Sequence, residues 1–163
     1  MPEHLSPWFG KGVRFWQYPH QFAKLLTLLK GRPVRSYLEI GCRWGGTFII
    51  VDQLLRELNP CMVSYAMDVI ECSPLLGNYC HETPGAHYIQ GDSGRIEAWE
   101  TLPDQVDVIF IDGDHSYGAV RRDFNLAMKF CPHTIIIHDT ASDACPDVVK
   151  YWHELKQVFN LKA

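Results

Sequence analysis

Two hydrophobic periods alternate along this chain of 163 residues. Short continuous apolar runs, which are typical of buried strands, are separated by longer segments in which apolar side chains recur every three or four positions, as on one face of a helix. The predicted strands are residues 36–40, 61–67, 86–90, 106–111 and 134–137. The predicted helices are residues 19–30, 45–58, 74–81, 117–130 and 146–159, with one further helical turn around 94–100.

The alternation of strands and helices predicts an α/β fold, a Rossmann-like doubly wound parallel sheet of about five strands. Such sheets bind ligands beyond the carboxyl ends of their strands. We expect one domain over residues 34–163, preceded by a lead segment and helix over residues 1–33. The lead segment holds four aromatic side chains without a clean period, which we expect to cap the core rather than to cover a pocket: Trp8, Phe9, Phe15 and Trp16.

Charge and composition exclude several classes of partner. The net charge is −4 and no basic run occurs, so nucleic acid is not expected as a partner. No apolar stretch reaches the roughly 18 residues that cross a membrane, and the first residues lack the basic-then-apolar pattern of a secretory signal. The six cysteines form no CxxC pair, which is typical of reduced thiols. We therefore expect a cytoplasmic protein without a nucleic-acid or membrane partner.

The junction between the first strand and its helix carries glycines where a ligand is expected. Residues 36–46 read Ser-Tyr-Leu-Glu-Ile-Gly-Cys-Arg-Trp-Gly-Gly, an apolar strand that runs through glycines into a helix. Glycine lets the backbone approach a ligand, and the helix start presents unpaired N–H groups, an arrangement suited to a nucleotide-like cofactor. A second polar cluster, Ile-Asp-Gly-Asp-His-Ser-Tyr at residues 111–117, follows another predicted strand. Two such sites indicate a cofactor and a substrate that face each other.

Five segments together resemble class I S-adenosylmethionine-dependent methyltransferases. In order they are Leu-Glu-Ile-Gly-Cys-Arg-Trp-Gly-Gly, Met-Asp-Val, Gly-Asp-Ser, Val-Asp-Val-Ile-Phe-Ile-Asp-Gly-Asp-His-Ser-Tyr and Ile-Ile-Ile-His-Asp-Thr. The closest resemblance is to the branch with macrolide-sugar O-methyltransferases and cephalosporin hydroxylase-associated proteins, and it covers about residues 34–160. The family's loop often has a middle glycine, where this chain has Arg43 and Trp44. The resemblance implies methyl transfer from S-adenosyl-L-methionine to an oxygen of a small-molecule acceptor, assisted by a divalent metal, magnesium or manganese.

The resemblance assigns cofactor binding to residues at three strand ends. Glu39 and the glycine turn would surround the methionine part of the cofactor, and Asp68 would accept hydrogen bonds from both ribose hydroxyls. Asp92, with Ser93 beside it, would lie near the adenine amine. Without a ligand, the same residues would form a strand-to-helix turn, a surface loop and an ordinary polar turn. The full set is Glu39, Gly41, Gly45, Gly46, Asp68, Asp92 and Ser93.

The catalytic assignment rests on two residues of the second cluster, Asp112 and His115. Methyl transfer to a hydroxyl needs a nucleophile in line with the donor methyl and a group that removes the hydroxyl proton. His115 is the predicted general base, because an imidazole titrates near neutral pH; the alternative is a residue that hydrogen-bonds the loop where the helix begins. Asp114 is expected to cap that helix, although it could instead orient His115.

The metal assignment uses Asp112, His138 and Asp139. The two aspartates follow adjacent predicted strands and could both bind one divalent ion, which would stabilise the developing oxyanion. His138 stands where the resembling family usually has a second acid. A histidine favours manganese, zinc or iron over magnesium, or leaves a site with two ligands.

The predicted strands are fewer than the seven that the resembling family usually has. We therefore expect a sheet that lacks the usual C-terminal antiparallel hairpin, and an open sheet edge through which two copies could form a homodimer. Two other functions stay open: an S-adenosylmethionine-binding protein without turnover and, less favoured, an NAD-dependent oxidoreductase. The oxidoreductase is disfavoured because the glycines at 41, 45 and 46 do not have the GxGxxG spacing.

Overall fold

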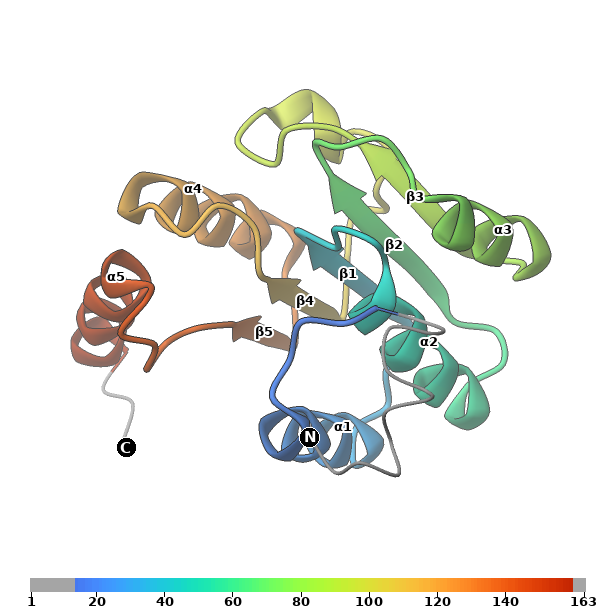
Figure 1. Cartoon of the computed structure of the whole chain (residues 1–163), viewed down its shortest axis with the longest axis horizontal. Helices are drawn as coiled ribbons and strands as arrows, with labels where there is room; N and C mark the ends of the chain where they lie inside the picture. Colours follow the sequence, from blue (N-terminus) through green and yellow to red (C-terminus); the bar gives the residue numbers. More distant parts are fainter. Residues whose placement is uncertain (1–13, 160–163) are drawn as a thin grey trace, which may run out of the picture.

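A five-stranded parallel sheet lies between two layers of helices in the computed structural model, which describes residues 14–159 (Figure 1). The strand order is β3-β2-β1-β4-β5, and every neighbouring pair is parallel. The strands are β1 Ser36–Ile40, β2 Val63–Asp68, β3 Ala86–Gln90, β4 Val108–Ile111 and β5 Thr134–Ile137. The helices are α1 Pro19–Lys30, α2 Gly46–Leu58, α3 Pro74–Glu82, α4 Tyr117–Ala127 and α5 Pro146–Val158, with short 3-10 helices η2 Ile96–Trp99 and η3 Met128–Phe130. The predicted Rossmann-like α/β sheet is confirmed.

The sheet is buried on both faces, and each face has its own apolar cluster. On one face, α1, α2 and α3 pack around Tyr37 and Phe110, which are almost inaccessible to solvent. On the other face, α4 and α5 pack around Leu38 and Ile109, and Trp99 of η2 is also covered. Successive residues of a strand point to opposite faces, so a strand that is covered on both sides needs apolar residues at every position. This explains the unbroken apolar run of β4.

Two strands begin later than the sequence predicts. β4 begins at Val108 because the two residues before it form hydrogen bonds outside the ladder. The N–H of Val106 donates to the carbonyl of Phe130, and the N–H of Asp107 donates to the hydroxyl of Ser36. β2 likewise begins two residues late, and the predicted last turn of α4 tightens into η3.

β5 forms one edge of the sheet, and no antiparallel hairpin follows it within the described residues. All four of its residues are half-buried, which leaves the edge open there. The homodimer through this edge and the division at residue 34 stay predictions. Within residues 14–159, no helix is long and apolar enough to cross a membrane.

Residues 14–18, which we call the strap, precede α1, and Nε2 of Gln17 in the strap donates to Asp112 directly after β4. Phe15 packs against Phe22 of α1, with ring centroids 5.4 Å apart, but it is 38% exposed and also borders the cavities described below. Trp16 is 73% exposed and does not cap the core. It borders cavities described below instead. Two of the predicted capping residues lie outside the described part of the chain: Trp8 and Phe9.

Candidate active site

The crevice at the carboxyl ends of the strands gathers most of the predicted site residues. β1 lies at the centre of the sheet, and the chain proceeds from it to β2 on one side and later to β4 on the other. Ligands of open α/β sheets bind at such a switch point. The structure places on this rim a side chain from each of four strand ends: Glu39, Asp68, Asp112, and the pair His138 and Asp139.

Three neighbouring cavities share this rim. The first cavity, of about 570 Å³, lies at the ends of β1, β2 and β3 and is bordered by Gly41, Asp68, Asp92 and Ser93. The second cavity, of about 550 Å³, lies between the strap and the loop after β5. A connecting cavity of about 120 Å³ lies between the glycine turn, the strap and the rim. His115 borders all three cavities and therefore stands where their contents would meet.

Two glycines of the turn are required by close backbone packing. Gly41 has a φ of 83°, and a Cβ there would lie 2.1 Å from the carbonyl oxygen of Asp112. A Cβ at Gly46 would lie 1.7 Å from the carbonyl oxygen of Arg14 in the strap. Both positions border the connecting cavity. The absence of side chains therefore brings β4 and the strap against the turn, in addition to leaving room for a ligand.

Gly45 does not border any of the three cavities. It is the residue before α2 and has a left-handed φ of 85°. A Cβ there would lie 2.8 Å from the side chain of Leu76 in α3. The structure thus explains this glycine by the turn and by helix packing, and does not bring it to the predicted cofactor site.

Arg43 and Trp44 link the glycine turn to the strap. The guanidinium of Arg43 lies 4.3 Å from the ring centroid of Trp44 and 5.0 Å from that of Trp16. The guanidinium of Arg14 lies 5.6 Å from the Trp44 ring. A cation over an aromatic face contributes about 0.5–1 kcal/mol at an exposed site. The backbone N–H of Arg43 also donates to Oδ2 of Asp68 at 2.6 Å, so the turn is fastened to the end of β2 as well.

Glu39 is a buried acid whose carboxyl faces the connecting cavity. Its side chain is covered, and it accepts a hydrogen bond of 2.7 Å from the hydroxyl of Tyr37. Burial raises the pKa of Glu39 to about 8, only partly opposed by the Tyr37 hydrogen bond and reinforced by the nearby charge of Asp112. At neutral pH this carboxyl therefore keeps its proton unless a positive group enters the cavity.

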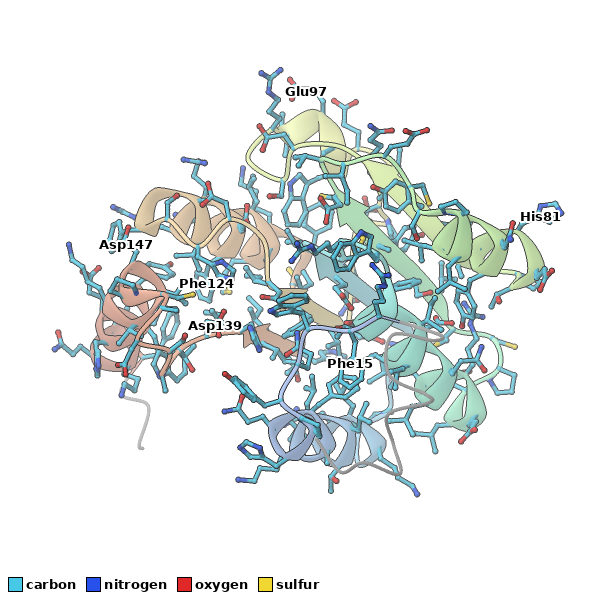
Figure 2. The ribbon with its side chains drawn as sticks, viewed as in Figure 1. Phe15, His81, Glu97, Phe124, Asp139 and Asp147 are labelled. Atoms are coloured by element: carbon cyan, nitrogen blue, oxygen red, sulfur yellow. The ribbon has the colours of Figure 1, made fainter. Side chains whose placement is uncertain are left out.

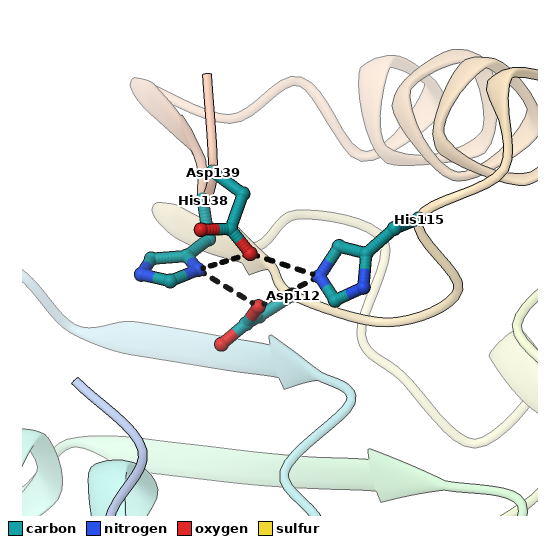
Figure 3. Close-up of side chains that lie close together, drawn as sticks. All are labelled: Asp112, His115, His138 and Asp139. Carbon is teal, nitrogen blue, oxygen red and sulfur yellow. Dashed lines mark hydrogen bonds and ion pairs between the residues drawn. The ribbon is translucent and has the colours of Figure 1, made fainter. Parts of the chain in front are cut away.

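Asp112, His115, His138 and Asp139 bring their polar atoms together in a closed ring (Figure 3). Nε2 of His115 lies 3.4 Å from Oδ1 of Asp112 and 3.3 Å from Oδ2 of Asp139. Nδ1 of His138 lies 3.1 Å from that Asp112 oxygen and 3.2 Å from that Asp139 oxygen. One ligand atom from each residue lies within 4.8 Å of all the others. We call this cluster the four-residue ring.

The members of the ring shift one another's protonation. Burial disfavours a charged Asp112, but the close contacts with His115 and His138 and the hydrogen bond from Gln17 outweigh it and lower the pKa of Asp112. The hydrogen bond with Asp112 raises the pKa of His115, against the opposing effect of burial. Burial also opposes a charge on His138, but its contacts with Asp112 and Asp139 outweigh it and raise the pKa of His138. The ring therefore favours positive charge at its centre.

Two further side chains hold the aspartates of the ring, and the sequence indicated neither. Nε2 of Gln17 in the strap donates to Oδ2 of Asp112 at 2.9 Å. Sγ of Cys145 donates to Oδ2 of Asp139 at 3.4 Å. Asp139 lies beside the end of β5 (Figure 2). Gln17 lies 95 positions before Asp112 in a segment without a hydrophobic period, so no local pattern could have linked them.

Asp114 does not cap α4, and the expectation that it would was wrong. Ser116 occupies the capping position, and its hydroxyl accepts a hydrogen bond from the N–H of Ala119 at 3.4 Å. Oδ1 of Asp114 accepts from the N–H of Ser116 at 2.9 Å and shapes the turn before the helix. A hydroxyl directly before the first helical residue satisfies an unpaired N–H group there.

Comparison with known proteins finds one family match and one relative that matches over a short stretch. Residues 38–140 match the family described as Methyltransferase domain. An uncharacterized protein of Acanthamoeba polyphaga mimivirus is 55% identical over 39 residues, which are 24% of this chain. The match spans 18% of the viral protein's length, less than a fifth.

Several solved structures share the fold. A provisionally assigned caffeoyl-CoA O-methyltransferase from Staphylococcus aureus is 18% identical, with a TM-score of 0.67 over 95% of this chain and 81% of that one. An O-methyltransferase from Bacillus cereus, in complex with SAH, is 19% identical, with a TM-score of 0.61 over 87% and 71%. The MycE methyltransferase of the mycinamycin pathway, with Mg, SAH and mycinamycin VI, is 21% identical, with a TM-score of 0.57 over 96% and 46%. At these identities the likeness is one of fold.

Proposed function

We propose that this chain transfers a methyl group from S-adenosylmethionine to an oxygen of a small molecule. The premise is that the chain belongs to the methyltransferase domain family, which its residues 38–140 match. The observation that carries the proposal is the pair of cavities on either side of one rim. Methyl transfer needs the donor carbon and the acceptor oxygen about 3–3.5 Å apart and aligned. A donor in the first cavity and an acceptor in the second would meet at the four-residue ring.

The first and connecting cavities suit the cofactor. S-adenosylmethionine carries a sulfonium and an ammonium, and the acids that border these cavities complement positive charge. Glu39 would face the methionine part, where an ammonium would favour its ionised form. Asp68 accepts one backbone N–H at each oxygen, from Arg43 and Ile70, and keeps further acceptor sites for the ribose hydroxyls. Asp92 and Ser93 would lie beside the adenine amine.

The second cavity suits a small acceptor. Its volume of about 550 Å³ lies within the usual range of small-molecule sites. Phe15, Trp16 and Tyr18 of the strap border it, and so do His115 and Asp139. Aromatic walls bind apolar or ring-shaped groups, while the polar side would face the oxygen that is methylated. The MycE complex holds its acceptor, mycinamycin VI, together with SAH and Mg, which supports an acceptor site next to the cofactor in this fold.

The ring can hold a divalent ion and can also accept a proton. The donor set is suitable, because one ligand atom from each residue lies within 4.8 Å of the others. A bound ion would stabilise negative charge on the acceptor oxygen and so make the hydroxyl more acidic. Asp112, His138 and Asp139 are the predicted ligands. Nε2 of His115 is the predicted proton acceptor, but the same atom faces both aspartates, so it cannot act as a base while it binds an ion.

Calorimetric titration tests cofactor binding. We expect the full chain to bind S-adenosylmethionine and its demethylated product, and not NAD. Asp68→Ala should weaken binding of both by about 10-fold or more, since a ribose hydroxyl loses its charged acceptor. Asp104→Ala is the matched control, because Asp104 is an exposed aspartate that borders none of the three cavities. Binding of NAD alone would overturn the proposal.

Turnover separates an enzyme from a protein that only binds the cofactor. Formation of the demethylated cofactor is measured with a panel of small hydroxylated molecules, and a product with one added methyl on oxygen is expected. Cofactor binding without turnover on any acceptor of the panel would favour the binding protein without catalysis.

A further inference from the structure

We infer that the four-residue ring is a binding site for a first-row transition-metal ion such as Mn²⁺, Fe²⁺ or Zn²⁺, in preference to Mg²⁺, with both imidazole nitrogens as ligands. The inference deepens the proposed function and rests on it only for the use of the ion in catalysis. Binding of the ion itself depends on the geometry and chemistry of four side chains: Asp112, His115, His138 and Asp139.

The distances around the ring leave room for one ion at its centre. The four contacts between imidazole nitrogens and carboxylate oxygens measure 3.4, 3.3, 3.1 and 3.2 Å. If the four atoms form a tetrahedron, its centre lies about 2.0 Å from each, and if they form a square, about 2.3 Å. Bonds from zinc to histidine nitrogen or carboxylate oxygen are about 2.0–2.2 Å. The ring therefore has the size of a first coordination shell.

The nitrogen of His138 lacks another partner. Nδ1 is shielded from solvent, and it makes no well-directed hydrogen bond to any group among the described residues. It nevertheless lies almost equally far from Asp112 and Asp139, at 3.1 and 3.2 Å. A buried polar atom without a hydrogen bond costs free energy, so such an atom usually has a function. A ring nitrogen placed between two carboxylate oxygens is the arrangement expected of atoms that share a metal ion.

Side chains outside the ring hold the ligands in place. Gln17 binds the second oxygen of Asp112, which leaves Oδ1 facing both imidazoles. Cys145 donates to the ring-facing oxygen of Asp139. The ring of Phe110 packs edge-on against His138, with centroids 6.0 Å apart. Such outer contacts fix the orientation of metal ligands.

The donor atoms decide which ion is preferred. Magnesium has bonds of about 2.0–2.1 Å, so distance alone would admit it, but it prefers an all-oxygen octahedron and keeps several waters. Imidazole nitrogen binds manganese, iron, cobalt and zinc more strongly, in the general order of divalent ions. Two carboxylates and two neutral imidazoles also balance the charge of one divalent ion. This assignment replaces the predicted proton-accepting role of His115, because a lone pair bound to a metal cannot take a proton.

A Co²⁺ titration of the chelator-treated full chain, followed by visible absorption, tests the inference. We expect absorption typical of nitrogen and oxygen ligands, and displacement by Zn²⁺ but not by a roughly 100-fold excess of Mg²⁺. Mg²⁺ that displaces Co²⁺ at comparable concentration would overturn the preference. No cofactor or acceptor is present, so the result does not depend on methyl transfer.

Substitutions assign the ligands. His115→Ala and His138→Ala should each weaken Co²⁺ binding by more than about 10-fold. His138→Asp, which supplies an oxygen, should shift the preference toward Mg²⁺. His133→Ala is the matched control, since Nδ1 of His133 lies 3.6 Å from Oδ1 of Asp107, outside the ring, and binding should not change. Wild-type affinity in both alanine variants would refute the assignment.

A measurement on the wild-type protein avoids any effect of substitution on folding. Long-range proton–nitrogen NMR spectra of the histidine rings should show Nε2 of His115 and Nδ1 of His138 shifting when Zn²⁺ is added. Unchanged ring nitrogens would overturn the inference even if Zn²⁺ binds elsewhere. Metal binding at these nitrogens without any binding of S-adenosylmethionine would uphold the inference and contradict the proposed function. Binding of S-adenosylmethionine without metal binding at these nitrogens would overturn the inference and leave the proposed function standing.

Discussion

Replacement of Glu39 by glutamine should remove a specific pH dependence of stability. Glu39 is buried at 1% exposure, and its pKa is raised from 4.5 to about 8, chiefly by burial. The folded protein therefore keeps a proton that the unfolded chain has already lost at neutral pH. Unfolding releases this proton, so the free energy of unfolding falls as pH rises from about 4.5 to about 8.

The size of the effect follows from the shift. One proton released on unfolding lowers the free energy of unfolding by about 1.4 kcal/mol for each pH unit. Over the interval from 4.5 to about 8 the full contribution of Glu39 is about 5 kcal/mol. Glutamine keeps the shape and can still accept the hydrogen bond from Tyr37, but it has no proton to release. The Glu39→Gln protein should therefore be close to wild type at pH 5 and more stable than wild type at pH 8.

Urea unfolding between pH 5 and pH 8.5, followed by tryptophan fluorescence without cofactor, measures the difference between the two proteins. His115 and His138 also lose stabilising charge as pH rises, because their pKa values are raised, but this loss is common to both proteins and cancels. Glu97→Gln is the matched control, since Glu97 is exposed on η2 at the surface (Figure 2), and its pH profile should follow wild type. Parallel profiles for Glu39→Gln and wild type would refute the reasoning.

Two further substitutions test other parts of the structure. In Gly46→Ala, the new Cβ would lie 1.7 Å from the carbonyl oxygen of Arg14, so the strap or the turn must move. The free energy of unfolding in urea should fall by about 1–3 kcal/mol, as for other overpacked positions, and an unchanged value would contradict the contact. Asp52→Asn should lower the free energy of unfolding by about 3–5 kcal/mol in urea, because it removes the buried negative charge that lies 2.6 Å from the largely covered guanidinium of Arg56. A loss below about 1 kcal/mol would show that this ion pair is not essential.

Much of the fold could be predicted because each prediction depends on residues close together in the chain. The bounds of β1, β3, β5 and α1 agree with the hydrophobic pattern, since burial on one or two faces dictates residue type at successive positions. The pattern placed β4 two residues early. Val106 and Asp107 are buried like strand residues, but their N–H groups bind a carbonyl and a hydroxyl outside the ladder. The apolar pattern of a sequence indicates which residues are buried, but it does not indicate the hydrogen-bond partners of their backbone groups.

The candidate site likewise has a part that the sequence predicted and a part that it did not. The position of the acids at strand ends follows from the parallel sheet, so Asp68, Asp112 and Asp139 were expected on one rim, and the structure places them there. The glycine motif gave no indication that Gly45 faces Leu76 of α3 while its neighbours face the cavity. Local sequence indicates a turn, and packing decides which side of it is open.

The sequence by itself determined the alternating strands and helices, the parallel order that brings their carboxyl ends together, and the kinds of polar residue found there. Only the tertiary structure decided that the strap lies across the rim, that Gln17 binds Asp112, and that His115 closes a ring with His138. The physical reason is the distance along the chain over which each kind of interaction acts. Periodicity and turn chemistry act over a few residues, whereas these contacts join segments that are far apart in the chain and meet only when the sheet has formed.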